Sequence, residues 1–294
     1  MRQRKKVKRY PVDLFKRNLK NITIVLVGLV FSVLIFIAVD YQSFVYPPEQ
    51  AEQPSPKNFI IRKFQSSPQQ ALKPEVIEHG PRNKKVVALT FDADMTPGML
   101  ALLQKGVVKS WYNKPIKDTL DRENVPATIF LTGLWVKAYP QEAKELAQDK
   151  LIEIGNHSYA HPAFTKSCFK LPFLSESAVD EVEQAQKEIV AVTGVTPKYF
   201  RFPGGCYDKV NLETVAKLGL KVVHWDVISG DGFNPNTQSI INKVESQVQN
   251  GSIIVFHIHG GPNAPKTNDA LEKIIPDLKK RGFQFVTVSE LLRN

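Results

Sequence analysis

The sequence has little excess of positive charge once its first twenty residues are set aside. The formal net charge of the 294-residue chain is +10, from 39 Lys and Arg against 29 Asp and Glu. Residues 1–20 hold nine of the basic side chains and one acidic one, which leaves 30 basic and 28 acidic side chains elsewhere. The basic charge is therefore a property of the N-terminal tail, and we expect no nucleic-acid partner.

Internal repeats at the spacing of solenoids or propellers are also missing, which excludes repeat architectures. The chain is long enough for one large domain or two small ones, and its 43% of hydrophobic residues can form a sizeable core. Cysteine is scarce, with Cys168 and Cys206 as the two examples. They could form a disulfide in an oxidising compartment, but two thiols alone leave this open.

Charged residues are absent from the 18 residues Ile22–Val39. A helix of that length can cross a hydrocarbon layer of about 30 Å. No small-x-small cleavage site follows, which argues against a cleaved signal peptide, and the basic tail predicts a cytoplasmic N-terminus. A buried core helix is the alternative, but it rarely follows nine charges. We expect a basic cytoplasmic tail at residues 1–21 and an uncleaved transmembrane signal anchor at 22–39, with the rest of the chain outside the cytoplasm at the cell membrane.

Residues 40–83 are rich in Pro, Gln and Ser and have little periodic apolar content, which is typical of an extended linker. From residue 84 onward, seven short apolar runs alternate with amphipathic helical patterns; the runs are VVALTF, ATIFLT, LIEIGN, KYFRF, LKVVHW, SIIVFH and FQFVTV. This alternation predicts an α/β domain of parallel β/α units over residues 84–294. Seven units favour closure into a barrel over an open sheet, although spacing alone does not decide this. The chemistry of such folds gathers at the carboxyl ends of the strands.

A histidine pair, His157 and His161, follows one of these strand ends. Residues at i and i+4 share one side of a helical turn, which we expect here with Asn156 as its N-cap. Two imidazoles on one side suit a divalent transition metal, with two structural or solvent-facing histidines as the alternative. The H-E-x-x-H zinc-protease motif is excluded because Ser158 stands where that motif needs Glu.

Two carboxylates, Asp92 and Asp94, end the stretch TFDAD after another apolar run. Catalytic metal sites usually take three protein ligands. One aspartate can complete the histidine pair, and the other can act as general base on a water that the metal acidifies. A helix-cap or turn role is the alternative for these acids.

Five stretches, TFDAD, HSYAHP, RFPGG, WDVISGD and IVFHIH, resemble in their order and spacing the motifs of the polysaccharide deacetylases, the NodB homology domain of carbohydrate esterase family four. The similarity covers roughly residues 84–292. It implies a distorted (β/α)7-type barrel and metal-dependent removal of N-acetyl groups from GlcNAc residues of a cell-envelope or exported polysaccharide, peptidoglycan or chitin-like. O-deacetylation, or a catalytically silent carbohydrate-binding module on the same fold, are the alternatives.

The resemblance implies that Asp92 is the general base and that Asp94, His157 and His161 hold the metal. The family commonly has its two acids adjacent, so Ala93 is a departure that shifts the ligand to Asp94. Zinc is the expected ion for such a ligand set, with cobalt or nickel as alternatives.

The resemblance also implies that Arg201 orients the base, that Asp231 pairs with this arginine, and that His257 is the general acid. Gly204 stands where the family usually has Tyr, and its backbone N–H is expected to stabilise the oxyanion. The usual Trp after the motif-four aspartate is replaced by Gly232.

Three further side chains are weaker candidates for the site. Trp225 and Phe233 could stack on a sugar, with core packing as an equal alternative for each, and His259 could contact substrate. The segment 99–125 is long and is expected to form a loop over the cleft. We expect a monomer whose partners are the polysaccharide and, through the anchor, the membrane.

Overall fold

The computed structural model describes residues 73–175 and 177–293. The predicted tail, the anchor and most of the predicted linker lie outside the described residues. Within the described ranges, the helices are all too short or too polar to span a bilayer.

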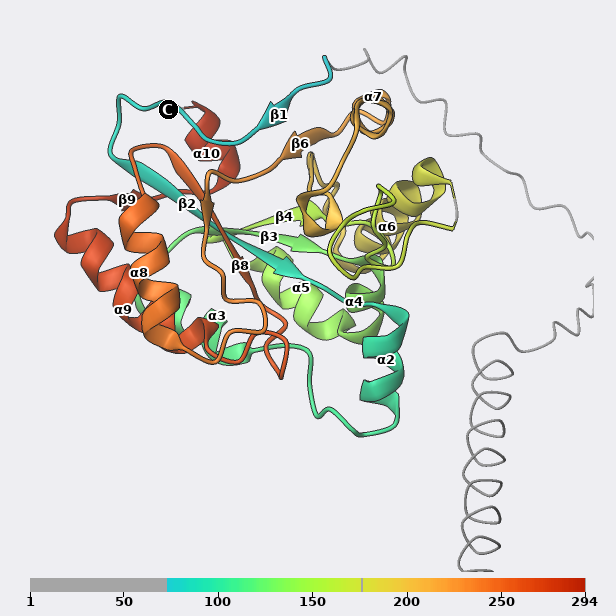
Figure 1. The fold of residues 1–294 in the computed structure, drawn as a ribbon, viewed down its shortest axis with the longest axis horizontal. Coiled ribbons are helices and arrows are strands. Elements are labelled where there is room, and N and C mark those ends of the chain that lie inside the picture. Colours follow the sequence, from blue (N-terminus) through green and yellow to red (C-terminus); the bar gives the residue numbers. More distant parts are fainter. Residues whose placement is uncertain (1–72, 176, 294) are drawn as a thin grey trace, which may run out of the picture. The chain divides into compact units, whose positions relative to one another are not determined.

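A curved parallel sheet forms the centre of the domain (Figure 1). In the order in which they pair, its strands are β1 (Val76–Ile77), β6 (Lys221–Val223), β5 (Tyr199–Phe200), β4 (Ile152–Asn156), β3 (Ala127–Leu131), β2 (Val86–Ala93), β8 (Ser252–His257) and β7 (Val227–Ile228). A further strand, β9 (Gln284–Phe285), pairs with the start of β2 off this path. The predicted parallel β/α architecture is therefore confirmed.

The predicted distorted (β/α)7-type barrel is confirmed in part, since the sheet is a curled parallel half-barrel. Each of the seven predicted runs contains a strand, but the sheet is open, because β1 and β7 end the path and the described residues show no pairing between them. The last predicted run contributes β9 beside β2 instead of extending an edge. β1 and β7 have two residues each, too few to show a hydrophobic period in the sequence.

Helices cover the sheet and connect its strands (Figure 1). They are α2 (Pro97–Gln104), α3 (Lys114–Arg122), α4 (Gly133–Ala138), α5 (Pro140–Gln148), α6 (Ala178–Thr193), α7 (Lys209–Lys217), α8 (Thr237–Gln247), α9 (Thr267–Lys280) and α10 (Val288–Arg293), with the short 3-10 helix η1 (Pro203–Gly205). Local sequence sets their ends. Ser177 caps α6 by accepting from the Val179 N–H, and Gly194 ends that helix in the left-handed conformation.

The domain begins earlier than the predicted boundary at residue 84. β1 pairs with β6, and the Gly80 N–H donates to the Gly251 carbonyl at 2.8 Å. Arg82 forms an ion pair of 2.7 Å with Asp226. The last residues assigned to the linker are therefore part of the folded domain.

Alternation along β2 directs the acidic side chains to one face of the sheet. Leu89 and Phe91 belong to the main hydrophobic cluster under the helices, whereas Ala88 belongs to a separate cluster on the opposite face. Thr90 and Asp92 share the face of Ala88 because side chains alternate along a strand. The Asp92 side chain therefore lies near the C-terminal end of the buried strand β2.

A disulfide joins Cys168, in the segment between β4 and α6, to Cys206 just after η1. The two residues are separated by 38 positions, so the bond closes a long loop. It ties together two segments that follow different strand ends.

We expect the double substitution Cys168→Ser/Cys206→Ser to destabilise the protein by about 3 kcal/mol, because the unfolded chain regains the entropy of the open loop. Thermal unfolding should show a melting temperature lower by about 6 °C or more. A reductant should lower the wild-type melting temperature and leave the double variant unaffected. Equal melting temperatures for both proteins would contradict a structural role for the bond.

Candidate metal and catalytic site

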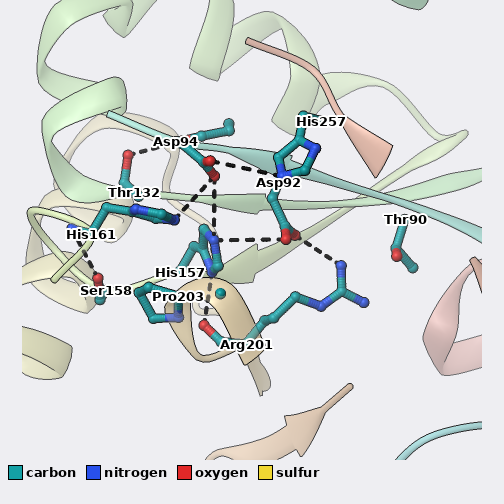
Figure 2. A network of polar contacts seen from close by, with 12 residues as sticks. Thr90, Asp92, Asp94, Thr132, His157, Ser158, His161, Arg201, Pro203 and His257 are labelled. Atoms are coloured by element: carbon teal, nitrogen blue, oxygen red, sulfur yellow. Dashed lines mark hydrogen bonds and ion pairs between the residues drawn. The ribbon is translucent and has the colours of Figure 1, made fainter. Parts of the chain in front are cut away.

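The predicted site residues meet at the carboxyl ends of the strands (Figure 2). They come from five strand ends, and the contributors are Asp92 and Asp94 at the end of β2, His157 and His161 after β4, Arg201 after β5, Asp231 after β7, and His257 at the end of β8. Segments far apart in sequence are brought together because parallel strands end at the same edge of the sheet.

Three side chains converge as a metal-ligand set. Asp94 Oδ1 lies 3.4 Å from His157 Nε2 and 3.3 Å from His161 Nε2. Ligand atoms held about 2.0–2.1 Å from zinc in a tetrahedron lie about 3.3 Å from one another. These two distances fit one ion held among the three atoms, which all lie within 4.8 Å of one another.

The polar atoms of this set need a partner that the described residues do not supply. Asp94 Oδ1 and His157 Nε2 are buried without a hydrogen bond to any described residue, an arrangement that costs free energy unless a cation is bound. His157 Nδ1 lies 2.8 Å from the Arg201 carbonyl. Donation there leaves the Nε2 lone pair directed at Asp94, the usual arrangement for a metal-binding histidine.

The charge state of the set also suits a cation. Burial lowers the pKa of His161 to about 4, so its ring is neutral at pH 7. Burial alone would raise the pKa of Asp94, but His161 and His259 hold it well below its ordinary value. Burial alone would lower the pKa of His157, and Asp92 and Asp94 raise it instead. The carboxylates thus attract positive charge, for which a proton and a metal ion compete.

The predicted helical turn at residues 157–161 is wrong. The segment is a loop in which Ser158 and His161 have φ of 69° and 61°. The expected N-cap residue still acts locally, since Asn156 Oδ1 accepts from the Ser158 N–H at 2.9 Å. Positive φ at non-glycine residues costs about 1–3 kcal/mol and is found at functional sites. Here it brings the two imidazole centroids to 4.9 Å.

Arg201 holds Asp92, as predicted. Its Nη1 donates to Asp92 Oδ1 at 2.8 Å, and both groups are buried. The other guanidinium nitrogens donate to the carbonyls of Val223 and His224, and the guanidinium carbon lies 4.1 Å from the Phe130 ring centroid. Removal of one partner from such a buried pair costs about 3–5 kcal/mol.

Asp231 pairs with His257, so its predicted pairing with Arg201 is wrong. His257 Nδ1 lies 2.8 Å from Asp231 Oδ1, and the His257 backbone N–H donates to Oδ2 at 2.8 Å. Thr267 and Ser229 donate their hydroxyl protons to the same carboxylate at 2.7 and 3.0 Å. Both carboxylate oxygens are therefore engaged away from the arginine.

This pairing controls the charge of His257. Burial alone would lower the pKa of the imidazole, but the Asp231 carboxylate reverses this and raises it to about 10. The reciprocal attraction outweighs the effect of burial on Asp231 and holds its pKa below the ordinary value. The His257 side chain is 27% exposed, and its Nε2 lies 3.9 Å from Asp94 Oδ2. A protonated imidazole therefore stands at the edge of the metal-ligand set.

Gly204, the predicted oxyanion donor, lies in η1 with φ of 62°. The first N–H groups of a helix have no partner within it, so this amide is suited to binding an oxygen. A Cβ at residue 204 would lie 2.8 Å from the sulfur of Cys168. Glycine is therefore required here, which explains why the usual tyrosine is missing.

The weaker candidates have different environments. Trp225 is half-buried and stacks on His224 with centroids 4.0 Å apart, as the packing alternative predicted. Phe233 is 77% exposed and has φ of 54°, so its ring is available for stacking. His259 is only 3% exposed, which is against the predicted substrate contact, and its Nε2 lies 3.2 Å from Asp94 Oδ2.

Two residues of the site were missed in the sequence. Ser229 lies two positions before Asp231, a spacing that could have identified it as a local hydrogen-bond donor. Thr267 begins α9, 36 positions away from its partner, and no local pattern marks it.

A buried carboxylate–arginine pair, a carboxylate–imidazolium pair and a His–His–Asp ligand set at the strand ends together define a hydrolase-type site. The sequence profile described as polysaccharide deacetylase matches residues 79–223. The chain belongs to this family, carbohydrate esterase family four, whose members are hydrolases. The predicted family and enzyme class are thus confirmed.

Named relatives of the chain act on peptidoglycan. A peptidoglycan-N-acetylglucosamine deacetylase of Bacillus cereus is 32% identical over 215 residues, which are 72% of this chain and 91% of the relative. The peptidoglycan-N-acetylmuramic acid deacetylase PdaA of Bacillus subtilis is 29% identical over 250 residues, 84% of this chain and 81% of the relative. A solved structure of a family-four pseudoenzyme from Bacillus anthracis has a TM-score of 0.61 at 26% identity, over 75% of this chain and 69% of the other.

We expect Asp94→Ala to weaken zinc binding at least 100-fold, because the substitution removes one of three ligands. Isothermal titration of the metal-free protein measures this change. Asp92→Asn is the matched control, since Asp92 is buried beside the set and its Oδ1 is bonded to Arg201, but it is not one of the three ligands; this variant should keep zinc affinity within about tenfold. Equal zinc affinity for wild type and Asp94→Ala would remove Asp94 from the ligand set.

Proposed function

We propose that the protein hydrolyses N-acetyl groups of GlcNAc residues in a cell-envelope polysaccharide, with peptidoglycan as the leading substrate and zinc as the ion. One observation carries the proposal. Two groups of opposite charge flank the Asp94–His157–His161 set. Asp92 is paired with Arg201, and His257 is kept protonated by the neighbouring Asp231 carboxylate.

The opposed pairs supply a base and an acid to one reaction. Asp92 Oδ2 faces the ligand set, 3.7 Å from His157 Nε2, while Oδ1 is held by the arginine. His257 faces the set from β8, which is hydrogen-bonded to β2 so that Asp92 and His257 are register partners. A carboxylate on one side of the ligand set and an imidazolium on the other can act as base and acid at one pH.

A divalent ion held by the three ligands would polarise the acetyl carbonyl and make a water molecule more acidic. Asp92 accepts the proton of the attacking water. The Gly204 N–H donates to the oxygen that becomes negative in the transition state. His257 donates its Nε2 proton to the departing sugar nitrogen, and Asp231 stabilises the imidazolium before the transfer.

The acid favours an amide substrate over an ester. A sugar amine is a poor leaving group unless its nitrogen is protonated, whereas an alcohol leaves an ester more easily. The four contacts that fix and charge the His257–Asp231 pair support the harder reaction.

The substrate class is supported by the relatives, whose names specify N-acetylglucosamine or N-acetylmuramic acid of peptidoglycan. We place the exposed Phe233 ring beside the sugar, because Gly232 before it lies near His257, with a Cβ there 3.5 Å from the imidazole. Aromatic faces of this kind stack on sugar rings.

We also propose that the domain works outside the cytoplasm, tethered by the apolar segment 22–39. The disulfide between Cys168 and Cys206 supports this, because such bonds persist in oxidising compartments. Tethering would keep the enzyme close to envelope glycans.

The proposal is tested by acetate release from peptidoglycan and from N-acetylated chitooligosaccharide, with the full chain before chelation, after chelation and after zinc is restored. We expect zinc-dependent release, lowered by about 10²–10⁴ in Asp92→Asn because the general base is lost. Mass spectrometry of peptidoglycan fragments identifies which sugar has lost its acetyl group.

Cobalt and nickel are tested in parallel with zinc. Release from an O-acetylated glycan without release from N-acetylated ones would replace the proposal by O-deacetylation. Loss of acetyl groups from muramic acid alone would retain the reaction and correct the sugar.

The pH dependence tests the acid. His257 is active when protonated, and its pKa is raised, so the rate should hold until the pH rises toward about 10 and fall above it. Asp231→Asn removes the attraction that raises this pKa, so the alkaline fall should move to lower pH. Profiles of kcat/KM against pH measure the shift.

Asp226→Asn is the matched control for this shift. Asp226 precedes the same strand, β7, but bonds to Arg82 and Ser252 at the start of β8, away from His257. An alkaline limb unchanged in Asp231→Asn would exclude His257 as the acid that Asp231 controls.

A further inference from the structure

Two aspartates at the end of β2 and two histidines at the end of β8 lie at corresponding positions, one of each pair inside its strand and one just beyond it. Asp92 and His257 are partners in the parallel ladder, and the Ile258 N–H donates to the Asp92 carbonyl at 3.0 Å, which extends the pairing past both strands. Two residues further along each chain come Asp94 and His259. The D-x-D and H-x-H patterns therefore lie side by side, with Asp92 and His257 paired in the ladder and Asp94 in contact with His259 beyond it.

Asp94 needs support that Asp92 obtains from its strand and from Arg201. It lies one residue beyond the end of β2 at Ala93. Its Oδ1 faces His157 and His161, while Oδ2 faces His259 Nε2 at 3.2 Å. The two carboxylate oxygens of Asp94 therefore face different partners: Oδ1 faces the two histidines of the proposed metal site, and Oδ2 faces His259.

His259 is itself held rigidly. Its ring is buried and meets the Trp111 indole edge-on, with centroids 6.4 Å apart. Trp111 is fixed by its Nε1–H, which donates to the Met99 carbonyl at 2.8 Å, and by its backbone N–H, which donates to the Tyr139 hydroxyl at 2.6 Å. Trp111 belongs to segment 99–125, which was predicted to form a loop over the cleft. Its buried side chain packs against His259.

We propose that His259 is a positioning residue for the metal. In the tautomer protonated at Nε2, rather than at the Nδ1 that lies 3.3 Å from the Gly260 carbonyl, the ring donates to Asp94 Oδ2. This contact keeps Oδ1 aimed at the ion, which compensates for the residue inserted between the two acids. This inference rests on the proposed metal site and deepens it. Hydrogen-bond partners behind metal ligands typically contribute 10–100-fold to metal affinity.

The test compares zinc affinity, by competition with a chromophoric chelator, in wild type, His259→Gln and His259→Asn full-length proteins. The Gln amide N–H reaches the position of Nε2, and the Asn amide is one methylene too short. We expect Asn to lose 10–100-fold in affinity and Gln to stay within a few-fold of wild type. Deacetylation by the Asn variant should recover when zinc is raised above its weakened dissociation constant, whereas a folding defect would not respond in this way.

Each alternative result has a defined meaning. Wild-type affinity in His259→Asn, or equal losses in Asn and Gln, would overturn the positioning role. Binding of two zinc ions by wild type and one by both variants would also overturn it, because Asp94, His257 and His259 would then be ligands of a second ion. If wild type binds no zinc, the metal site itself fails, and this outcome is distinct from failure of His259 alone. Circular dichroism of the metal-free proteins confirms that the compared variants are folded.

Discussion

The burial of three carboxylates at one edge of a parallel sheet is the constraint on which the rest of the site depends. Asp92 and Asp231 are 5% and 1% exposed, and the side chain of Asp94 is 13% exposed. Negative charges so placed repel one another and lose hydration, so each requires a positive partner. Arg201 serves the first and His257 the second, while the third faces His157, His161 and His259. The division explains how two acids separated by one residue coexist at the end of β2.

The sequence was sufficient to predict strands and site residues where apolar runs or local motifs mark them. Apolar runs predicted seven of the strands, β2 to β6, β8 and β9, and the motifs identified the members of both charge pairs. The sequence was insufficient where packing between distant segments determines a backbone conformation, a side-chain partner or the closure of the sheet. Spacing of i and i+4 at His157 and His161 is compatible with a helix, but also with a loop that has two positive φ angles. The partner of Asp231 depends on how β7 lies against β8, and barrel closure depends on edge strands of two residues.

Departures from the family pattern have local structural causes. Gly204 follows from the approach of the disulfide, since a side chain there would collide with the Cys168 sulfur. Ala93 moves the second acid past the strand end, where His259, two residues beyond the end of β8, faces it. In both cases the altered position and its neighbour are distant in sequence but adjacent in the fold, so neither substitution is interpretable from one motif alone.

Arg201 serves the two halves of the site through different parts of one residue. Its guanidinium binds Asp92, and its backbone carbonyl accepts from His157. A main-chain acceptor persists whatever side chain is present, so the two contacts can be lost independently in evolution. A descendant that replaced the arginine side chain would lose the orientation of Asp92, while the His157 Nδ1–H would keep its main-chain acceptor.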